Sequence, residues 1–275
     1  MPRARILFLC LALALAAISA PPQAAHAQEE PTPVIIVDLS SGYLLGVAHF
    51  DAWLESSMAA DLVQPKINYE LYSLNGWAGT AVGLAAEEYS EICPETYAVP
   101  MIVRQVTDGP LMAIGGAMHD VMPRWPEQLN TSSEMYRGFV ADFLRQNGIP
   151  NPQVTITQLL RVDLEGDGTD EVLIAATHLQ DDYGLEVHAG DYSIVLLRQL
   201  VNGRVETTML EGEIFPVADQ YFVPTKRSIQ GVLDFDRDGV MEIVLGFSYY
   251  EGHSSGIFAK YVDGWEYVIG AGCGL

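Results

Sequence analysis

The sequence predicts a mainly β protein with one or two helices and antiparallel sheets. Three observations lead to this prediction. Short β-branched runs separated by glycine and proline recur along the chain, Asn-Gly and Asp-Gly turns join pairs of them, and one pattern of acids repeats after 71 positions. Runs of this length that end at turn residues are typical of strands, and such turns are typical of hairpins.

Residues 1–27 predict a secretory signal peptide. Arg3 and Arg5 precede the apolar run ILFLCLALALAAI, and Ala25-His-Ala27 has the small residues of a cleavage site. No other stretch approaches the roughly 18 apolar residues that a membrane span requires. We therefore expect an exported protein, secreted or periplasmic, with no membrane span.

The charge of the chain excludes one class of partner. The formal net charge is −22, and it becomes −24 when the predicted signal, which has two arginines and no acids, is removed. Such a charge repels polyanions and anionic membrane surfaces, so nucleic acid is excluded as a partner. Acids outside the two loops described below are expected to form a solvated surface that favours solubility.

Residues 28–150 predict a β-rich domain that contains both helices. After a polar leader at 28–33, strands are expected in VIIVDL, YLLGVAHF, KINYELYSL, GTAVGLAAEEY, TYAVPMIV and PLMAIGGA. A first helix is expected from Phe50 to Val63, because four apolar residues fall near one face.

A second helix is expected at about 132–147. The run from Thr131 to Glu134 has the spacing of a capping box, and an apolar stripe follows at helical spacing. Gly148 and Pro150 then end the helix. Such a stripe is typical of packing against a core.

Residues 151–275 contain one acidic loop written twice, as DLEGDGTDE and as DFDRDGVME. Both copies have acids at positions 1, 3, 5 and 9 and glycine at position 6, where the backbone must turn. Calcium takes about six to eight oxygen ligands, and alternate residues of a tight loop can turn inward onto one ion. The carbonyl of position 7 can add another ligand. The predicted ligands are Asp163, Glu165, Asp167, Thr169 and Glu171 in the first loop, and Asp234, Asp236, Asp238, Val240 and Glu242 in the second.

The loops differ from an EF-hand, and they contain more acids than a hairpin turn requires. An EF-hand loop closes with Glu at position 12, where this chain has Ile174 or Leu245, and the flanking runs are strand-like. The alternative is that Asp, Glu and Gly only form hairpin turns. Four acids within nine residues would repel one another without a cation. We therefore expect about two bound Ca²⁺ ions.

The pattern D-x-[DE]-x-D-G-x-x-E between two strands resembles the FG-GAP or VCBS repeat, the calcium loop of integrin-α-like β-propeller blades. In that family the acids at positions 1, 3, 5 and 9 and the carbonyl at 7 bind calcium, which implies the same ten residues here. The resemblance covers about residues 154–271. Glu165 departs from the usual Asp or Asn, and the Phe-Gly and Gly-Ala-Pro signatures are missing.

Each acidic loop opens a longer repeated unit. EVLIAATHL, DYSIVLLRQL and RVETTML follow the first loop, and EIVLGFSYY, SGIFAKY and WEYVIG follow the second. Each unit therefore predicts four antiparallel strands, which is the plan of a propeller blade. Two blades cannot close a propeller, which needs about four or more blades. Either the N-terminal half supplies the missing sheets, or the pair packs as a β-sandwich.

Two cysteines remain after removal of the predicted signal, Cys93 and Cys273. An even pair in an exported protein predicts a disulfide, and the alternative is two buried thiols. We do not expect the two cysteines to bind zinc, because neither has a second Cys or a His at ligand spacing.

The sequence contains no recognisable catalytic constellation. It has no H-E-x-x-H and no P-loop, and its histidines are scattered. It does not identify the oligomeric state or name the partner. We expect a non-catalytic, calcium-binding module that contacts a protein or glycan at the cell envelope, with the calcium in a structural role. The alternative is an extracellular polymer hydrolase with the calcium loops as scaffolding.

Overall fold

The structure is a computed structural model whose secondary structure confirms the prediction of a mainly β protein with antiparallel sheets and two short helices. The signal peptide predicted at residues 1–27 lies outside the part of the chain that is described. Within that part, no helix has the length and apolarity of a membrane span. The described residues are 32–49, 52–107, 109, 111–181 and 185–274.

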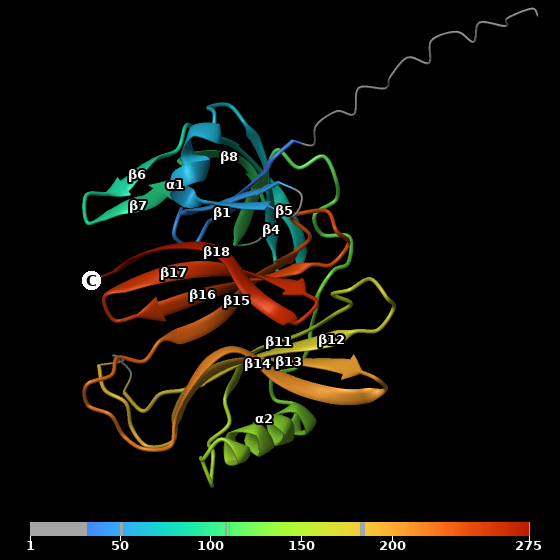
Figure 1. Cartoon of the computed structure of the whole chain (residues 1–275), viewed down its shortest axis with the longest axis vertical. Coiled ribbons are helices and arrows are strands. Elements are labelled where there is room, and N and C mark those ends of the chain that lie inside the picture. The colour runs from blue at the N-terminus through green and yellow to red at the C-terminus, as the bar shows by residue number, and fades with distance from the viewer. Residues whose placement is uncertain (1–31, 50–51, 108, 110, 182–184, 275) are drawn as a thin grey trace, which may run out of the picture. The chain divides into compact units, whose positions relative to one another are not determined.

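A seven-stranded antiparallel sheet and a separate hairpin contain the strands of the N-terminal half (Figure 1). Strand β1, inside the sheet, is apolar except for its last residue and is buried on both faces. The order in the sheet is β3-β2-β1-β9-β4-β5-β8, and β6 pairs with β7. The strands are β1 (Val34–Asp38), β2 (Leu44–His49), β3 (Ala52–Glu55), β4 (Asn68–Ser73), β5 (Gly76–Gly83), β6 (Glu87–Ser90), β7 (Cys93–Ala98), β8 (Met101–Val106) and β9 (Met112–Gly115).

The prediction of a helix over Phe50–Val63 is wrong for its first part, which is a strand, and the helix that does form is shorter than predicted. Phe50 is outside the described residues, strand β3 pairs with β2, and only Ser56–Ala59 is α-helical (α1), followed by a 3-10 turn at Ala60–Leu62. The physical reason is visible at Trp53 and Leu54. These neighbours pack against different hydrophobic clusters, as residues on opposite faces of a strand do.

The second helix is confirmed as α2 (Glu134–Gln146), but its cap differs from the prediction. Ser133 is the N-cap and its side chain makes no capping hydrogen bond. The capping box predicted from Thr131 is therefore not formed, because the helix begins two residues too late for it. Gly148 has φ +95° just beyond the helix end, as a C-terminal glycine commonly does.

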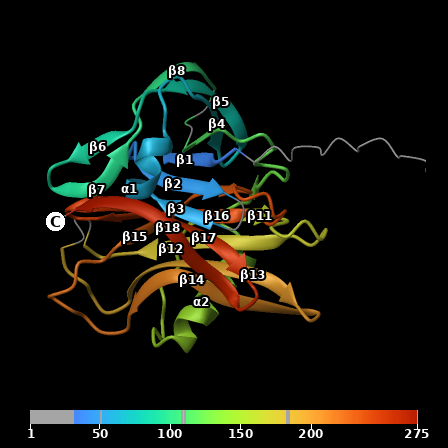
Figure 2. The ribbon, with the colours of Figure 1, turned by 45° about the horizontal axis from the view of Figure 1, so that its top comes forward.

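Two antiparallel meanders form the C-terminal half, and in each the spatial order of the strands is the order in the chain (Figures 1 and 2). The four strands predicted for each unit are present, and a short strand β10 extends the first sheet. Helix α2 packs on the first meander, with which it shares a hydrophobic cluster. The strands are β10 (Glu127–Gln128), β11 (Ile156–Val162), β12 (Glu171–His178), β13 (Asp191–Val201), β14 (Arg204–Phe215), β15 (Lys226–Leu233), β16 (Glu242–Tyr249), β17 (Gly252–Tyr261) and β18 (Gly264–Gly274).

One hydrophobic cluster joins the three larger sheets. It includes Ile36 of β1, Leu173 of β12 and Leu245 of β16, all of them fully buried. In the described residues the N-terminal half contributes one large sheet and one hairpin, and no further four-stranded meander.

The predicted disulfide between Cys93 and Cys273 is confirmed. It links β7 to β18 with a Cα–Cα distance of 5.6 Å, across 180 positions of sequence. Beside it, the hydroxyl of Thr96 donates to the carbonyl of Gly272 at 2.5 Å. The hairpin β6–β7 is thereby held against the last strand of the chain.

Candidate metal centre

Each acidic loop lies between the first two strands of a meander, as its flanking sequence predicts. The first loop joins β11 to β12 and the second joins β15 to β16. Gly168 and Gly239, at position 6 of the two loops, have φ +84° and +91°. A Cβ at either position would meet no atom within 4 Å, so glycine is required there by the backbone conformation and not by lack of space.

Both loops are closed by the same hydrogen bond between position 2 and position 9. The backbone N–H of Leu164 donates to Glu171 Oε2 at 2.9 Å, and that of Phe235 donates to Glu242 Oε2 at 2.7 Å. Glu171 and Glu242 are both buried. The two loops therefore share a local structure as well as a spacing.

Positions 5 and 7 also match between the loops. The N–H of Thr169 donates to Asp167 and the N–H of Val240 donates to Asp238, both at 2.7 Å. These carboxylates are exposed at the tips of the loops. Each aspartate thus holds the residue whose carbonyl was predicted as a ligand.

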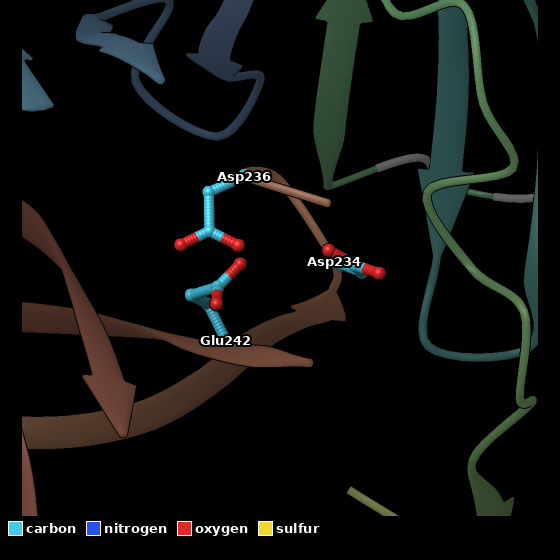
Figure 3. Close-up of side chains that lie close together, drawn as sticks. All are labelled: Asp234, Asp236 and Glu242. Atoms are coloured by element: carbon cyan, nitrogen blue, oxygen red, sulfur yellow. The ribbon is translucent and has the colours of Figure 1, made fainter. Parts of the chain in front are cut away.

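The second loop brings three carboxylates together (Figure 3). One oxygen from each of Asp234, Asp236 and Glu242 lies within 4.8 Å of the others. In Figure 3 the carboxylates of Asp236 and Glu242 face each other, and Asp234 lies beside them. Because calcium–oxygen distances are about 2.3–2.6 Å, oxygens spaced in this way can share one ion.

Burial and mutual repulsion favour the protonated form of these three groups when no cation is present. Burial, together with the neighbouring aspartates, raises the pKa of Glu242 to about 9 and that of Asp236 to about 6, and burial also raises the pKa of Asp234. In the described part of the chain, no lysine or arginine forms an ion pair with any of the three. A bound cation would remove this repulsion.

The first loop does not gather its carboxylates in the same way. Asp163 accepts hydrogen bonds from the N–H groups of Asp167 and Gly168, at 3.1 and 2.9 Å. Glu165 forms an ion pair with Lys260 of β17. Among the described residues, the group of three that could hold a metal lies in the second loop and not here. The longer Glu at position 3 reaches a neighbouring strand instead of the centre of its own loop.

Arg124 joins the two loops, although no sequence pattern marked it. Its guanidinium donates to the carbonyls of Asp163 at 2.5 Å, Leu164 at 3.1 Å and Gly239 at 2.7 Å. The N–H of Met241 adds a direct bond to the carbonyl of Leu164 at 2.9 Å. The loops therefore lie side by side. A lone arginine 39 residues before the first loop carries no spacing signal that could have revealed this contact.

The start of the second loop is fixed by the segment before Arg124. His119 Nε2 lies 2.9 Å from the carbonyl oxygen of Asp234, and the N–H of Asp234 donates to the carbonyl of Val121 at 2.8 Å. A carbonyl only accepts, so Nε2 of His119 carries the proton. His119 thus holds the backbone of Asp234, a candidate metal ligand, and is not itself one of the three candidate ligands.

A pocket of about 350 Å³ near the second loop is lined by Glu70, Tyr72 and His119. Glu70 is the one acid among its described lining residues, and its carboxylate accepts a hydrogen bond from the indole of Trp77. Hydrolysis of a glycoside commonly needs two carboxyl groups across one bond. This pocket does not provide that pair.

The chemistry of the candidate metal centre follows from its donors. Three carboxylates, with no sulfur or imidazole among them, favour a hard cation over a soft transition metal. The burial of Glu242 and the backbone bonds that hold each aspartate limit the freedom of the site before an ion arrives. No family model matches the chain, and no curated protein or solved structure matches it significantly.

Proposed function

We propose that the protein is an exported, calcium-binding, non-catalytic β module that contacts a protein or a glycan at the cell envelope. The main support for calcium binding is the convergence of the carboxylates of Asp234, Asp236 and Glu242. The disulfide supports an oxidising compartment outside the cytosol, since such bonds persist there. The resemblance to FG-GAP or VCBS loops points the same way.

Calcium fits this site better than magnesium. Calcium accepts irregular shells of about six to eight oxygens, whereas magnesium demands a near-octahedral shell and keeps several waters. Three carboxylates of one loop, with the carbonyl of Val240 close by in sequence, suit the more flexible ion. Extracellular calcium modules bind with Kd values of about 10⁻⁴–10⁻³ M, which matches an exported protein.

The proposed role of the ion is structural. The loop connects β15 to β16, two strands whose side chains contribute to the central cluster. By neutralising the three carboxylates, an ion would let the β15–β16 hairpin keep its acids ionised at neutral pH. An ion that binds only the folded chain stabilises it by mass action.

The first loop is proposed as the weaker of two ion sites. It has acids at the same four positions, but Lys260 already neutralises Glu165. A second ion would have to displace this ammonium group. The expected stoichiometry is therefore one ion bound at the second loop, with a second ion bound more weakly at the first.

Calorimetric titration with Ca²⁺ tests the proposal. The chain from residue 28 should bind one ion in the millimolar range or tighter, and Asp236→Asn should weaken that event by at least about tenfold, since it removes one of three charged ligands. Asp263→Asn is the matched control, because Asp263 is an exposed aspartate in the turn between β17 and β18. Equal affinities of the two variants would reject the metal assignment.

A further inference from the structure

A polar pocket lies at the other end of β16 from Glu242. It has a volume of about 460 Å³ and is lined by residues of β15, β16 and β17, with Ser40 from the turn after β1. None of the described residues that line it is Asp, Glu, Lys or Arg. Besides two tyrosines, five serines, one glutamine and one histidine supply its polar groups: Ser40, Ser228, Ser248, Ser254, Ser255, Gln230 and His253.

The register of the strands explains why these residues share one surface. Ser228 pairs with Gly246, Gly246 pairs with Ser255, and Ser248 pairs with His253. Directly paired residues of antiparallel strands point to the same face of a sheet. A patch of small and hydroxylated side chains therefore covers this face, where large apolar side chains would otherwise fill the space.

A β-bulge in β15 directs the side chain of Gln230 toward this patch. The register of β15 shifts between Ile229 and Gly231, which makes Gln230 the extra residue of a bulge, and bulges commonly redirect a side chain beside a functional site. The side chain then lies across Gly246, because a Cβ at position 246 would come within 2.2 Å of Gln230 Nε2.

Two buried polar atoms, on residues that line this pocket, have no hydrogen-bond partner among the described residues. They are Oε1 of Gln230 and Nε2 of His253. The imidazole of His253 is held in place by parallel stacking on Tyr43, with ring centroids 4.9 Å apart and an interplanar angle of 4°. Buried polar atoms are nearly always satisfied, so a polar ligand that enters the pocket and turns these two side chains toward itself would satisfy both atoms.

We propose that this pocket binds a neutral, polyhydroxylated ligand, of which a saccharide ring is the typical case. Sugar hydroxyls both donate and accept, so they can pair with Gln230, His253 and the serine hydroxyls together. The hydroxyls of Ser40 and Ser255 already donate to the buried carboxylate of Asp38 and can still accept. The described lining residues offer no charge to a charged ligand, and the nearby carboxylate of Asp38 is buried and already bonded to Ser40 and Ser255. Tyr249 and Tyr250 add aromatic surface against which the apolar face of a sugar can pack. The inference rests on the proposed contact with a glycan and gives that contact a location.

The proposal is tested by calorimetric titration of the chain from residue 28, in millimolar calcium, with four neutral probes: cellotriose, maltotriose, xylotriose and diacetylchitobiose. Trigalacturonic acid is the charged counterpart. We expect at least one neutral probe to bind with a submillimolar Kd and the charged probe not to bind. If none of the neutral probes binds, the pocket holds only water and the proposal is overturned.

Two variants localise the binding. Gln230→Ala removes an acceptor that has no partner in the folded chain, so it should weaken saccharide binding by about tenfold or more without lowering the melting temperature. Gly246→Ala should weaken it as well, by displacing Gln230. Gln199→Ala, on β13, is the matched control. Affinity unchanged by Gln230→Ala would exclude this pocket as the site.

Failure here can be separated from failure of the metal assignment. Saccharide binding is measured on the same samples as calcium binding. Loss of the former with normal calcium binding rejects only the pocket, and saccharide binding without calcium binding rejects only the metal centre.

Discussion

Glu242 combines two properties that rarely occur together in one carboxylate. It is 1% exposed, and it shares a small volume with the acids of Asp234 and Asp236. One of its oxygens is held by the N–H of Phe235 at 2.7 Å, which fixes the side chain inside the loop. Binding of a cation would favour the ionised form, so ion binding should release protons from this group.

The pKa of Glu242 predicts a pH-dependent stability. Burial raises it from 4.5 to about 9, so between these values the folded chain binds more protons than the unfolded chain. The stability that this group contributes is therefore fully present below about pH 4.5 and is lost as the pH rises toward 9. In chelator, the melting temperature should fall from pH 5 to pH 8, and calcium should remove most of the fall.

Glu242→Gln provides the control for this pH dependence. An amide does not titrate, so the variant in chelator should show a smaller fall between pH 5 and pH 8 than the parent chain. A fall of the same size in both proteins would mean that other groups cause it.

Lys260 predicts the behaviour of the first loop. Its ammonium group pairs with Glu165, so Lys260→Met should strengthen the second, weaker calcium event by roughly two- to fivefold, as expected for loss of a partly exposed ion pair. Calorimetric titration measures this event. Lys226→Met, at an exposed position of β15, is the control. An unchanged second event would contradict the view that Lys260 competes with the ion.

The sequence predicted correctly that each acidic loop joins two strands and turns at its glycine, but the spacing of the acids did not predict which acids meet. The positive φ at position 6 follows from the glycine, and the buried Glu at position 9 follows from the strand that begins there. The pairing of Glu165 with Lys260 depends on a strand 95 residues away. No local pattern contains that information.

At the scale of elements, the meanders were predictable because their signals are local. Hairpin turns and apolar runs specify four strands in each unit, and short connections place consecutive strands side by side. The stretch Ala52–Leu62 was misread for the same reason. Its apolar residues fit both helical and alternating spacing over so short a length, and pairing with β2 decides for the strand at its start.

The link between the two loops predicts the effect of removing Arg124. Arg124→Met deletes donors to three backbone carbonyls, two in the first loop and one in the second. We expect a loss of about 2 kcal/mol in the free energy of unfolding, in calcium and in chelator alike. Denaturant unfolding measures it, with Arg104→Met on the exposed face of β8 as the control. Equal losses in the two variants would contradict a linking role.

At the scale of the whole molecule, long-range contacts cross the boundary predicted near residue 150. The disulfide between Cys93 and Cys273 is one of them, and the hydroxyl of Ser255 donates to the buried carboxylate of Asp38 at 2.8 Å. The central hydrophobic cluster also draws on all three larger sheets. The cysteine pairing was predictable because only two cysteines lie outside the predicted signal peptide, whereas Asp38 and Ser255 carry no signal of their contact.

The central claim is that the second loop binds calcium and thereby stabilises the fold. Thermal unfolding of the chain from residue 28, in about 2 mM calcium and in chelator, tests it most directly. With calcium at about ten times Kd, the melting temperature should rise by roughly 3–6 °C, corresponding to about 1.4 kcal/mol. Glu242→Gln should abolish most of this rise, and Glu206→Gln, at an exposed position of β14, should leave it intact. An equal melting temperature in the two media, or a rise that survives Glu242→Gln, would contradict the claim.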